Sequence, residues 1–198
     1  RPGALDVPGN LVDENCDGVD ASGGAGDDIC DGGAGLLSGT LQARTEADIA
    51  ITSLTAGDFA GTALVTGDFN GDGDADLAVG LPGLDVNGGL SGGVSLFFGP
   101  LDPGQLSTDA ADVLLLGGAV RNRIGTTLAN AGDVDGDGAD DLLVGSLGGA
   151  ASLVTGATLI AETSVDLGFE ADATFVGSAF EGFGSAVGLP GDLDGDGF

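Results

Sequence analysis

The chain has 198 residues, a length that fits one large domain or two small ones. Its 32 acidic residues are set against four arginines, with no lysine or histidine, and the formal net charge at pH 7 is -28. A surface this negative repels phosphate backbones and anionic lipids, so we expect no nucleic-acid partner. No apolar stretch approaches the length of about 18 residues that spans a bilayer, so we expect no membrane insertion.

The composition nevertheless predicts a folded core. Hydrophobic residues make up 42% of the chain, more than a disordered segment of this charge would hold. Small and branched side chains must build the core, because Trp, Tyr and Met are absent and nine Phe are the only aromatic residues. The 41 Gly follow no three-residue period, which excludes collagen and indicates many tight turns.

The N-terminal segment, residues 1–35, is acidic and contains both cysteines, Cys16 and Cys30. A disulfide between them would indicate an oxidising, extracellular compartment, and two free thiols are the alternative. The segment also resembles a short metal-binding motif of secreted bacterial proteins. A weak metal site and a cysteine-stapled turn without metal both remain open for the oxygen-bearing residues Asp13, Asn15 and Asp17.

The remainder of the chain is repetitive. We divide it into copies at about 36–99, 100–156 and 157–198, the last one incomplete. In each copy an Ala-Asp pair opens an apolar run, and an Asp-rich loop begins 20 or 21 residues after the Asp of that pair. The first Asp residues of successive loops are 65 and 59 residues apart, so the similarity extends well beyond the loops themselves.

Each copy contains four short apolar runs separated by turn-forming residues. In the first copy they lie near 48–53, 61–67, 76–81 and 93–99. Runs this short predict strands, and four antiparallel strands per copy predict one blade of a β-propeller. We therefore expect an all-β fold, either a fragment of a larger propeller or an array that neighbouring chains complete.

The loops have the spacing of a metal site. Loop positions are counted from the first Asp of each loop, Asp68 or Asp133. Oxygen-bearing side chains recur at positions 1, 3, 5 and 9, and position 7 would offer its backbone carbonyl. A Gly at position 6 permits a sharp turn with positive φ. Six to eight oxygens suit Ca²⁺ better than Mg²⁺. The candidate ligands are Asp68, Asn70, Asp72, Asp74 and Asp76, then Asp133, Asp135, Asp137, Ala139 and Asp141, and in the third loop Asp192, Asp194 and Asp196.

An EF-hand is excluded although the first loop positions are similar. That motif needs a bidentate Glu at position 12 and a helix on each side, whereas position 12 is Val79 or Val144 within a predicted strand. A plain acidic turn is the other alternative, but several clustered carboxylates without a cation would repel one another.

These loops, with Phe183-Gly184 before the third and Gly80-Leu81-Pro82 after the first, resemble FG-GAP repeats, the blades of the integrin α-subunit β-propeller and of many bacterial surface proteins. The resemblance covers about residues 45–198 and implies Ca²⁺ binding by the loop residues named above. The second copy departs from the pattern, with Ile124 in place of Phe.

The resemblance implies an extracellular or cell-surface module for adhesion, with an unidentified protein or glycan as its partner. The alternative is a structural subunit of a surface layer or fibre that self-assembles through open edges. We expect no enzymatic activity, because without His, Lys or Tyr the usual general bases and nucleophile partners are missing.

Overall fold

The computed structural model describes residues 49–53, 55–86, 89–102, 104–118, 122–177 and 181–188. All of them belong to the second of the chain's two units, Asp48–Phe198. The predictions for the N-terminal segment therefore lie outside the described residues, as does the third loop. This applies to the pairing of Cys16 with Cys30, to Asp13, Asn15 and Asp17, and to Asp192, Asp194 and Asp196.

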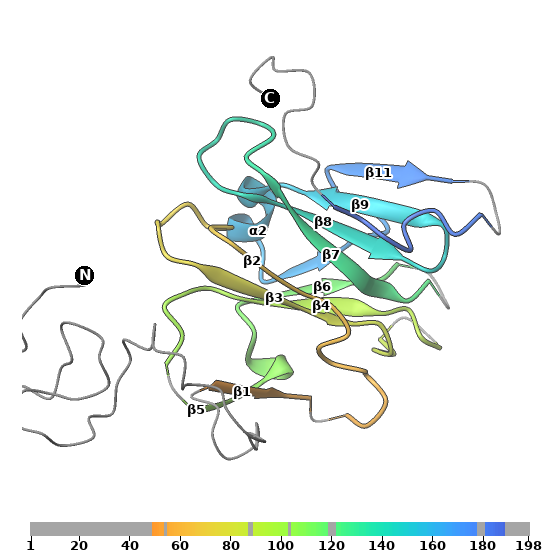
Figure 1. Cartoon of the computed structure of the whole chain (residues 1–198), viewed down its shortest axis with the longest axis horizontal. Coiled ribbons are helices and arrows are strands. Elements are labelled where there is room, and N and C mark those ends of the chain that lie inside the picture. The colour runs from red at the N-terminus through yellow and green to blue at the C-terminus, as the bar shows by residue number, and fades with distance from the viewer. Residues whose placement is uncertain are drawn as a thin grey trace, which may run out of the picture. The chain divides into compact units, whose positions relative to one another are not determined.

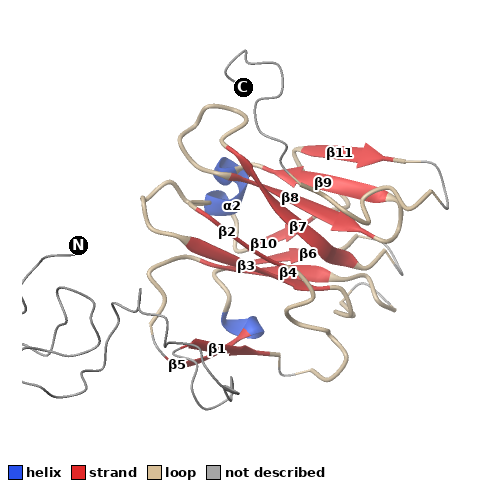
Figure 2. Cartoon of the chain, viewed as in Figure 1, coloured by secondary structure: helices blue, strands red, loops and turns tan. Residues whose placement is uncertain are grey.

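Two antiparallel sheets dominate the structure (Figure 2). Sheet 1 contains β2 (Leu64–Gly67), β3 (Asp76–Leu81), β4 (Gly93–Phe97) and β6 (Val113–Leu116), with β10 (Ser164–Asp166) added in parallel beside β6. Sheet 2 contains β7 (Ile124–Gly132), β8 (Asp141–Ser146), β9 (Ala150–Val154) and β11 (Ala173–Val176). The prediction of an all-β fold is confirmed, and each sheet has four antiparallel strands in the up-and-down order of a propeller blade.

A small third sheet and two short helices accompany the two large sheets. A third sheet pairs β1 (Ile49–Thr52) in parallel with β5 (Gly104–Ser107), and the only described helices are η1 (Thr108–Ala110) and α2 (Gly156–Ala161). In the chain, β5 lies between β4 and β6, and β10 lies between β9 and β11. The strands β5 and β10 are thus equivalent. Neither pairs with the strands just before and after it in the chain, and each pairs in parallel with an earlier strand that follows an Ala-Asp pair.

The sheets and the sequence copies are out of phase by one strand. The apolar run that opens the second copy becomes β6, the last antiparallel strand of sheet 1, and the run that opens the third copy becomes β11 of sheet 2. The Asp of each opening pair explains this placement: Asp112 Oδ2 accepts the N–H of Phe98 at 2.8 Å, and Asp172 Oδ2 accepts that of Thr155 at 2.8 Å. The second and third pairs therefore fasten their runs to the sheet of the preceding copy.

The core lies between the two sheets, which stack face to face (Figure 1). Alternate residues of β4, β6 and β8 point into it, as the period of two along a strand requires. The fully or almost fully buried side chains include Ala78, Val94, Leu96, Val113 and Leu115 from sheet 1, and Leu142, Val144 and Val154 from sheet 2. Small and branched residues make up most of this core, as the composition predicted, and Phe69 adds one fully buried aromatic ring.

Glycines hold the sheets close together. A Cβ on Gly80 of β3 would overlap the carbonyl oxygen of Gly125 of β7, and one on Gly145 of β8 would overlap the carbonyl oxygen of Gly184. Gly125 and Gly184 also share a left-handed backbone, with φ of +82° and +77°. The contact between sheets 1 and 2 is therefore repeated between sheet 2 and the segment that follows β11, residues 181–188.

Candidate metal centre

Two acidic loops occupy equivalent places in the two sheets. Loop 1 (residues 68–76) connects β2 to β3, loop 2 (residues 133–141) connects β7 to β8, and both emerge at the same end of the stacked sheets (Figure 1). The predicted Gly at position 6 is Gly73 or Gly138, and its φ is +92° or +96°. The expectation of a left-handed residue at the sharpest point of each loop is confirmed.

Loop 1 is folded by its own carboxylates. Asp68 accepts the N–H of Asp72 on Oδ1 at 3.0 Å and the N–H of Gly73 on Oδ2 at 2.9 Å. Asn70 Oδ1 accepts from Asp72 N at 2.9 Å, and Asp72 Oδ1 accepts from Asp74 N at 2.8 Å. The side chains at positions 1, 3 and 5 therefore curl inward over successive backbone N–H groups.

Loop 2 repeats this arrangement. Asp133 accepts the N–H of Asp137 at 3.0 Å and that of Gly138 at 2.9 Å, while Asp135 Oδ1 accepts from Asp137 N at 3.1 Å. Asp137 Oδ1 in turn accepts from Ala139 N at 2.9 Å. The same bonds from side chain to backbone thus form in both loops, although the residues at positions 2, 3, 7 and 8 differ.

The carboxylate at position 9 is buried in both loops. Asp76 is 1% exposed: Oδ2 accepts the N–H of Phe69 at 2.7 Å, and Oδ1 accepts that of Gly99 at 2.8 Å. Asp141 is 0% exposed, and its two oxygens accept from Val134 N at 2.7 Å and Gly156 N at 2.9 Å. Position 9 therefore ties the start of each loop to the backbone just beyond the third strand of its sheet.

Burial also changes the acidity of these two groups. Desolvation raises the pKa of Asp76 and of Asp141 above the ordinary value for Asp, although the backbone N–H donors lower it in part. Negative neighbours raise it further, namely Asp72 for Asp76, and Asp135 and Asp137 for Asp141. A nearby cation would favour the ionised form of both carboxyl groups.

Loop 2 brings three carboxylates together. One oxygen from each of Asp133, Asp135 and Asp141 lies within 4.8 Å of the other two, and Asp137 is not in this group. In loop 1 the amide at position 3 makes a different contact, because Asn70 Nδ2 donates to Asp72 Oδ2 at 2.8 Å. Loop 2 therefore offers the denser cluster of oxygen ligands for a hard divalent cation.

Two residues that the sequence analysis did not single out join the loops. Asp140, at position 8 of loop 2, accepts the N–H of Asp68 on Oδ2 at 3.0 Å, and its own N–H donates to the Asp68 carbonyl at 2.7 Å. Asn130 of β7 donates from Nδ2 to Asp140 Oδ2 at 2.7 Å and to the Thr66 carbonyl at 3.3 Å. The one signal of this contact in the sequence was that position 8 is an Asp in loop 2, Asp140, where loop 1 has Ala75.

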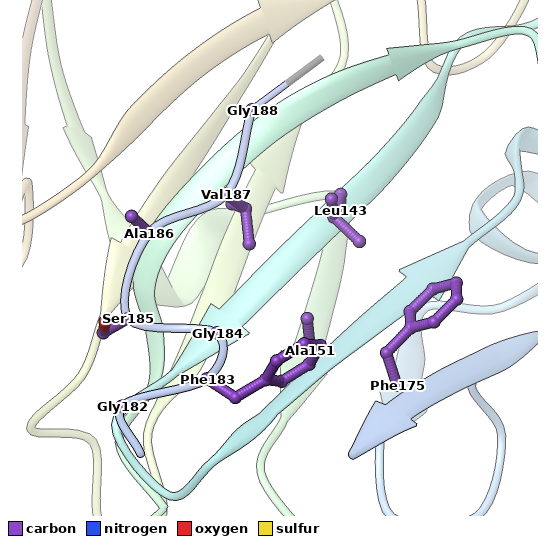
Figure 3. A pocket seen from close by; sticks show the side chains of 10 residues that line it. All are labelled: Leu143, Ala151, Phe175, Gly182, Phe183, Gly184, Ser185, Ala186, Val187 and Gly188. Atoms are coloured by element: carbon purple, nitrogen blue, oxygen red, sulfur yellow. The ribbon is translucent and has the colours of Figure 1, made fainter. Parts of the chain in front are cut away.

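The outer face of sheet 2 carries an apolar hollow of about 490 Å³ (Figure 3). Leu143, Ala151 and Phe175 line it from the sheet, and Phe183 and Val187 line it from the segment after β11. None of the described residues that line it has an ionisable side chain.

Comparison with known families agrees with the geometry of the first sheet. Residues 60–97, which span β2, loop 1, β3 and β4, match the FG-GAP repeat. No curated protein matches the chain. Among the described residues, no helix is long and apolar enough to cross a membrane. The chain therefore contains an FG-GAP repeat at residues 60–97.

Proposed function

We propose that the chain is a calcium-binding FG-GAP module and that loops 1 and 2 each hold one Ca²⁺. The convergence of Asp133, Asp135 and Asp141 in loop 2 carries the proposal. Ionised carboxylates are acceptors only and repel one another, by about 1 kcal/mol at 4 Å in water and about 4 kcal/mol at an effective dielectric constant of about 20. A divalent cation removes this repulsion.

The loop oxygens fit the coordination preference of Ca²⁺. Side-chain oxygens at positions 1, 3, 5 and 9 and the carbonyl at position 7 give five protein ligands, and bidentate carboxylates or water complete the six to eight that Ca²⁺ takes. The ligands would be Asp133, Asp135, Asp137, Asp141 and the Ala139 carbonyl in loop 2, and Asp68, Asn70, Asp72, Asp76 and the Asp74 carbonyl in loop 1.

Calcium would act on the structure and would not serve catalysis. The position 9 carboxylates already fasten each loop to the end of β4 or β9, so a rigid loop fixes one end of its sheet. FG-GAP repeats are typical of extracellular and surface proteins, which supports a secreted or cell-surface location and a role in adhesion to a protein or glycan. The absence of His, Lys and Tyr from the sequence supports a non-enzymatic role.

A second candidate is a subunit that self-assembles through sheet edges. Among the described strands, β6 pairs with β4 on one side and with β10 on the other, whereas β11 pairs with β9 alone. Phe175 and Val176 of β11 are 49% and 75% exposed. An apolar, unpaired edge favours strand addition from a neighbouring chain.

Thermal unfolding in calcium and in chelator tests the proposal, with magnesium as the competing ion. We expect a large loss of Tm in chelator that calcium restores and magnesium does not, because the loop carboxylates repel one another when no ion is bound. Asp133→Ala should remove one bound calcium, whereas Glu162→Gln removes an exposed charge outside the loops and should leave binding unchanged. An unchanged Tm in chelator would reduce the loops to acidic turns.

Sedimentation of the calcium-loaded chain separates the two candidate roles. A monomer at micromolar concentration supports the adhesion module. Concentration-dependent assembly that is abolished by Val176→Lys, a charge on the unpaired edge, supports the structural subunit.

A further inference from the structure

We infer that loops 1 and 2 bind calcium cooperatively, and that Asp140 is the positioning residue that couples them. The inference rests on the proposed function, since it concerns how two calcium loops influence each other. Asp140 is not at a predicted ligand position, and its contacts reach from loop 2 to the first residue of loop 1.

Asp68 is held from two sides. Its side chain closes loop 1, through the N–H groups of Asp72 and Gly73. Its main chain is held by loop 2, because Asp140 both accepts its N–H at 3.0 Å and donates to its carbonyl at 2.7 Å. A change in the position of Asp140 must therefore move the position 1 ligand of loop 1 or break two hydrogen bonds.

One peptide unit belongs to both loops. The carbonyl of Ala139 is the position 7 oxygen of loop 2, and the N–H of the same peptide bond, on Asp140, donates to Asp68. Hydrogen bonds in series polarise one another, so a cation held by the carbonyl strengthens the N–H donor across the peptide. Calcium bound in loop 2 would therefore strengthen the hydrogen bond that fixes the main chain of loop 1.

Packing around this peptide leaves little room for independent movement. Ala139 is 4% exposed, and a Cβ on Gly71 of loop 1 would lie 3.5 Å from the Cβ of Ala139 and 3.3 Å from the Gly138 carbonyl. Asn130 braces the other side, since Nδ2 donates both to Asp140 Oδ2 at 2.7 Å and to Thr66 O at 3.3 Å. When one loop becomes ordered, its packing contacts therefore restrict the movement of the other loop.

Coupling between the loops must be reciprocal. If calcium in loop 2 raises the affinity of loop 1 by some factor, calcium in loop 1 raises the affinity of loop 2 by the same factor. Couplings of this kind change affinity by about 5-fold to 150-fold. We expect the two loops to fill together over a narrow range of calcium concentration.

A loop-resolved calcium titration of the whole chain by NMR tests the inference. The amide protons of Gly73 and Gly138 report the loops separately, since each donates to the position 1 carboxylate of its own loop. In the wild type we expect coincident titration curves with a Hill coefficient above 1. Asp140→Ala removes the side-chain bond to the Asp68 N–H but keeps the main-chain N–H, so we expect the two curves to move apart, with Hill coefficients closer to 1 than in the wild type and an apparent affinity of loop 1 lower by about fivefold or more.

Two further variants separate coupling from charge. Asp140→Asn keeps an oxygen that can accept both donors and keeps the main-chain N–H, so it should retain the cooperativity although it lowers overall affinity. Asp74→Ala removes one exposed charge from loop 1 and installs the residue that loop 2 has at position 7, so both curves should shift with the Hill coefficient preserved. Loop 1 itself has Ala75 at position 8, so we expect loop 2 to fold normally in Asp140→Ala.

Amide exchange in chelator supplies a readout without metal. The Asp68 amide should exchange slowly in the wild type and in Asp140→Asn, and faster in Asp140→Ala. Independent titration of the two loops in the wild type, or a Hill coefficient in Asp140→Ala as high as that of the wild type, would overturn the coupling and leave calcium binding intact. A wild-type chain that binds no calcium would overturn both the coupling and the proposed function.

Discussion

Asp141 shows how a single side chain links a loop to its sheet. It is fully buried, and each carboxylate oxygen accepts one backbone N–H, from Val134 within loop 2 and from Gly156 at the start of α2. Asp76 repeats these contacts in loop 1. The sequence spacing identified both residues as candidate ligands, but their structural role depends on N–H groups 15 and 23 residues further along the chain, which no local pattern reveals.

Asp141→Asn should destabilise the chain even in chelator. An amide group would place N–H donors against one of the two backbone donors, and a buried donor left unpaired costs about 1–3 kcal/mol. The measurement is urea unfolding in chelator. Asp135→Asn is the matched control, because Asp135 is exposed and loop 1 has Asn70 at the same position, so its unfolding midpoint should barely move.

The acidity of Asp76 and Asp141 predicts opposite pH dependences with and without calcium. Both pKa values are raised in the folded state, so the folded chain binds more protons than the unfolded chain at pH values just above 3.8. In chelator, stability should therefore fall as pH rises through this window. In calcium, stability should fall on acidification because protons compete with the ion. Tm measured from acidic to neutral pH in both buffers checks the two signs.

At the scale of elements, the repeat was readable from the sequence while its register was not. In the sequence, Phe59 and Ile124 stand at the same distance before their loops. In the structure, the left-handed glycines at equivalent places in the two sheets are Gly61 and Gly125, with φ of +84° and +82°. These glycines differ by one residue in their distance from the loop. Phe59 is 62% exposed. The difference of one residue is absorbed in β7 by a register shift between Asn130 and Gly132.

This irregularity explains why the loop-to-loop contact escaped prediction. The extra residue of β7 is accommodated next to Asn130, whose Oδ1 accepts the N–H of Gly132 at 2.7 Å and whose Nδ2 reaches Asp140. A β-bulge redirects the side chain beside it, and its presence depends on pairing with β8 and not on local residue preference. The loops themselves were predictable, because the spacing of their oxygen-bearing residues is a property of consecutive residues.

The close contact between sheets predicts a steric effect at Gly145. In Gly145→Ala the new methyl group would overlap the Gly184 carbonyl and Thr127 Oγ1, and such overpacking costs about 1–3 kcal/mol. Gly188→Ala is the control, because a Cβ there would meet nothing within 4 Å. Chemical unfolding in calcium should separate the two variants, and equal midpoints would mean that residues 181–188 do not lie against sheet 2 in solution.

At the scale of the whole molecule, the net charge of -28 opposes folding through self-repulsion. Monovalent salt screens exposed charges, with a Debye length of about 10 Å at 0.1 M and about 3 Å at 1 M. The Tm of the chelated chain should therefore rise with added NaCl, and that of the calcium-loaded chain should rise less. A Tm in chelator that is independent of salt would show that repulsion is not what the ions relieve.

The repeated glycine contact has a consequence for how the chain orders itself. Sheet 2 meets sheet 1 through Gly80 and Gly125, and residues 181–188 meet sheet 2 through Gly145 and Gly184 in the same way. In a stack whose layers meet through such junctions, the free energy is approximately a sum of terms for single layers and for junctions. The face of sheet 2 shown in Figure 3 corresponds to the face of sheet 1 that is completely buried. A folded layer thus presents the face against which the next layer packs, and folding can propagate along the array from one layer to the next.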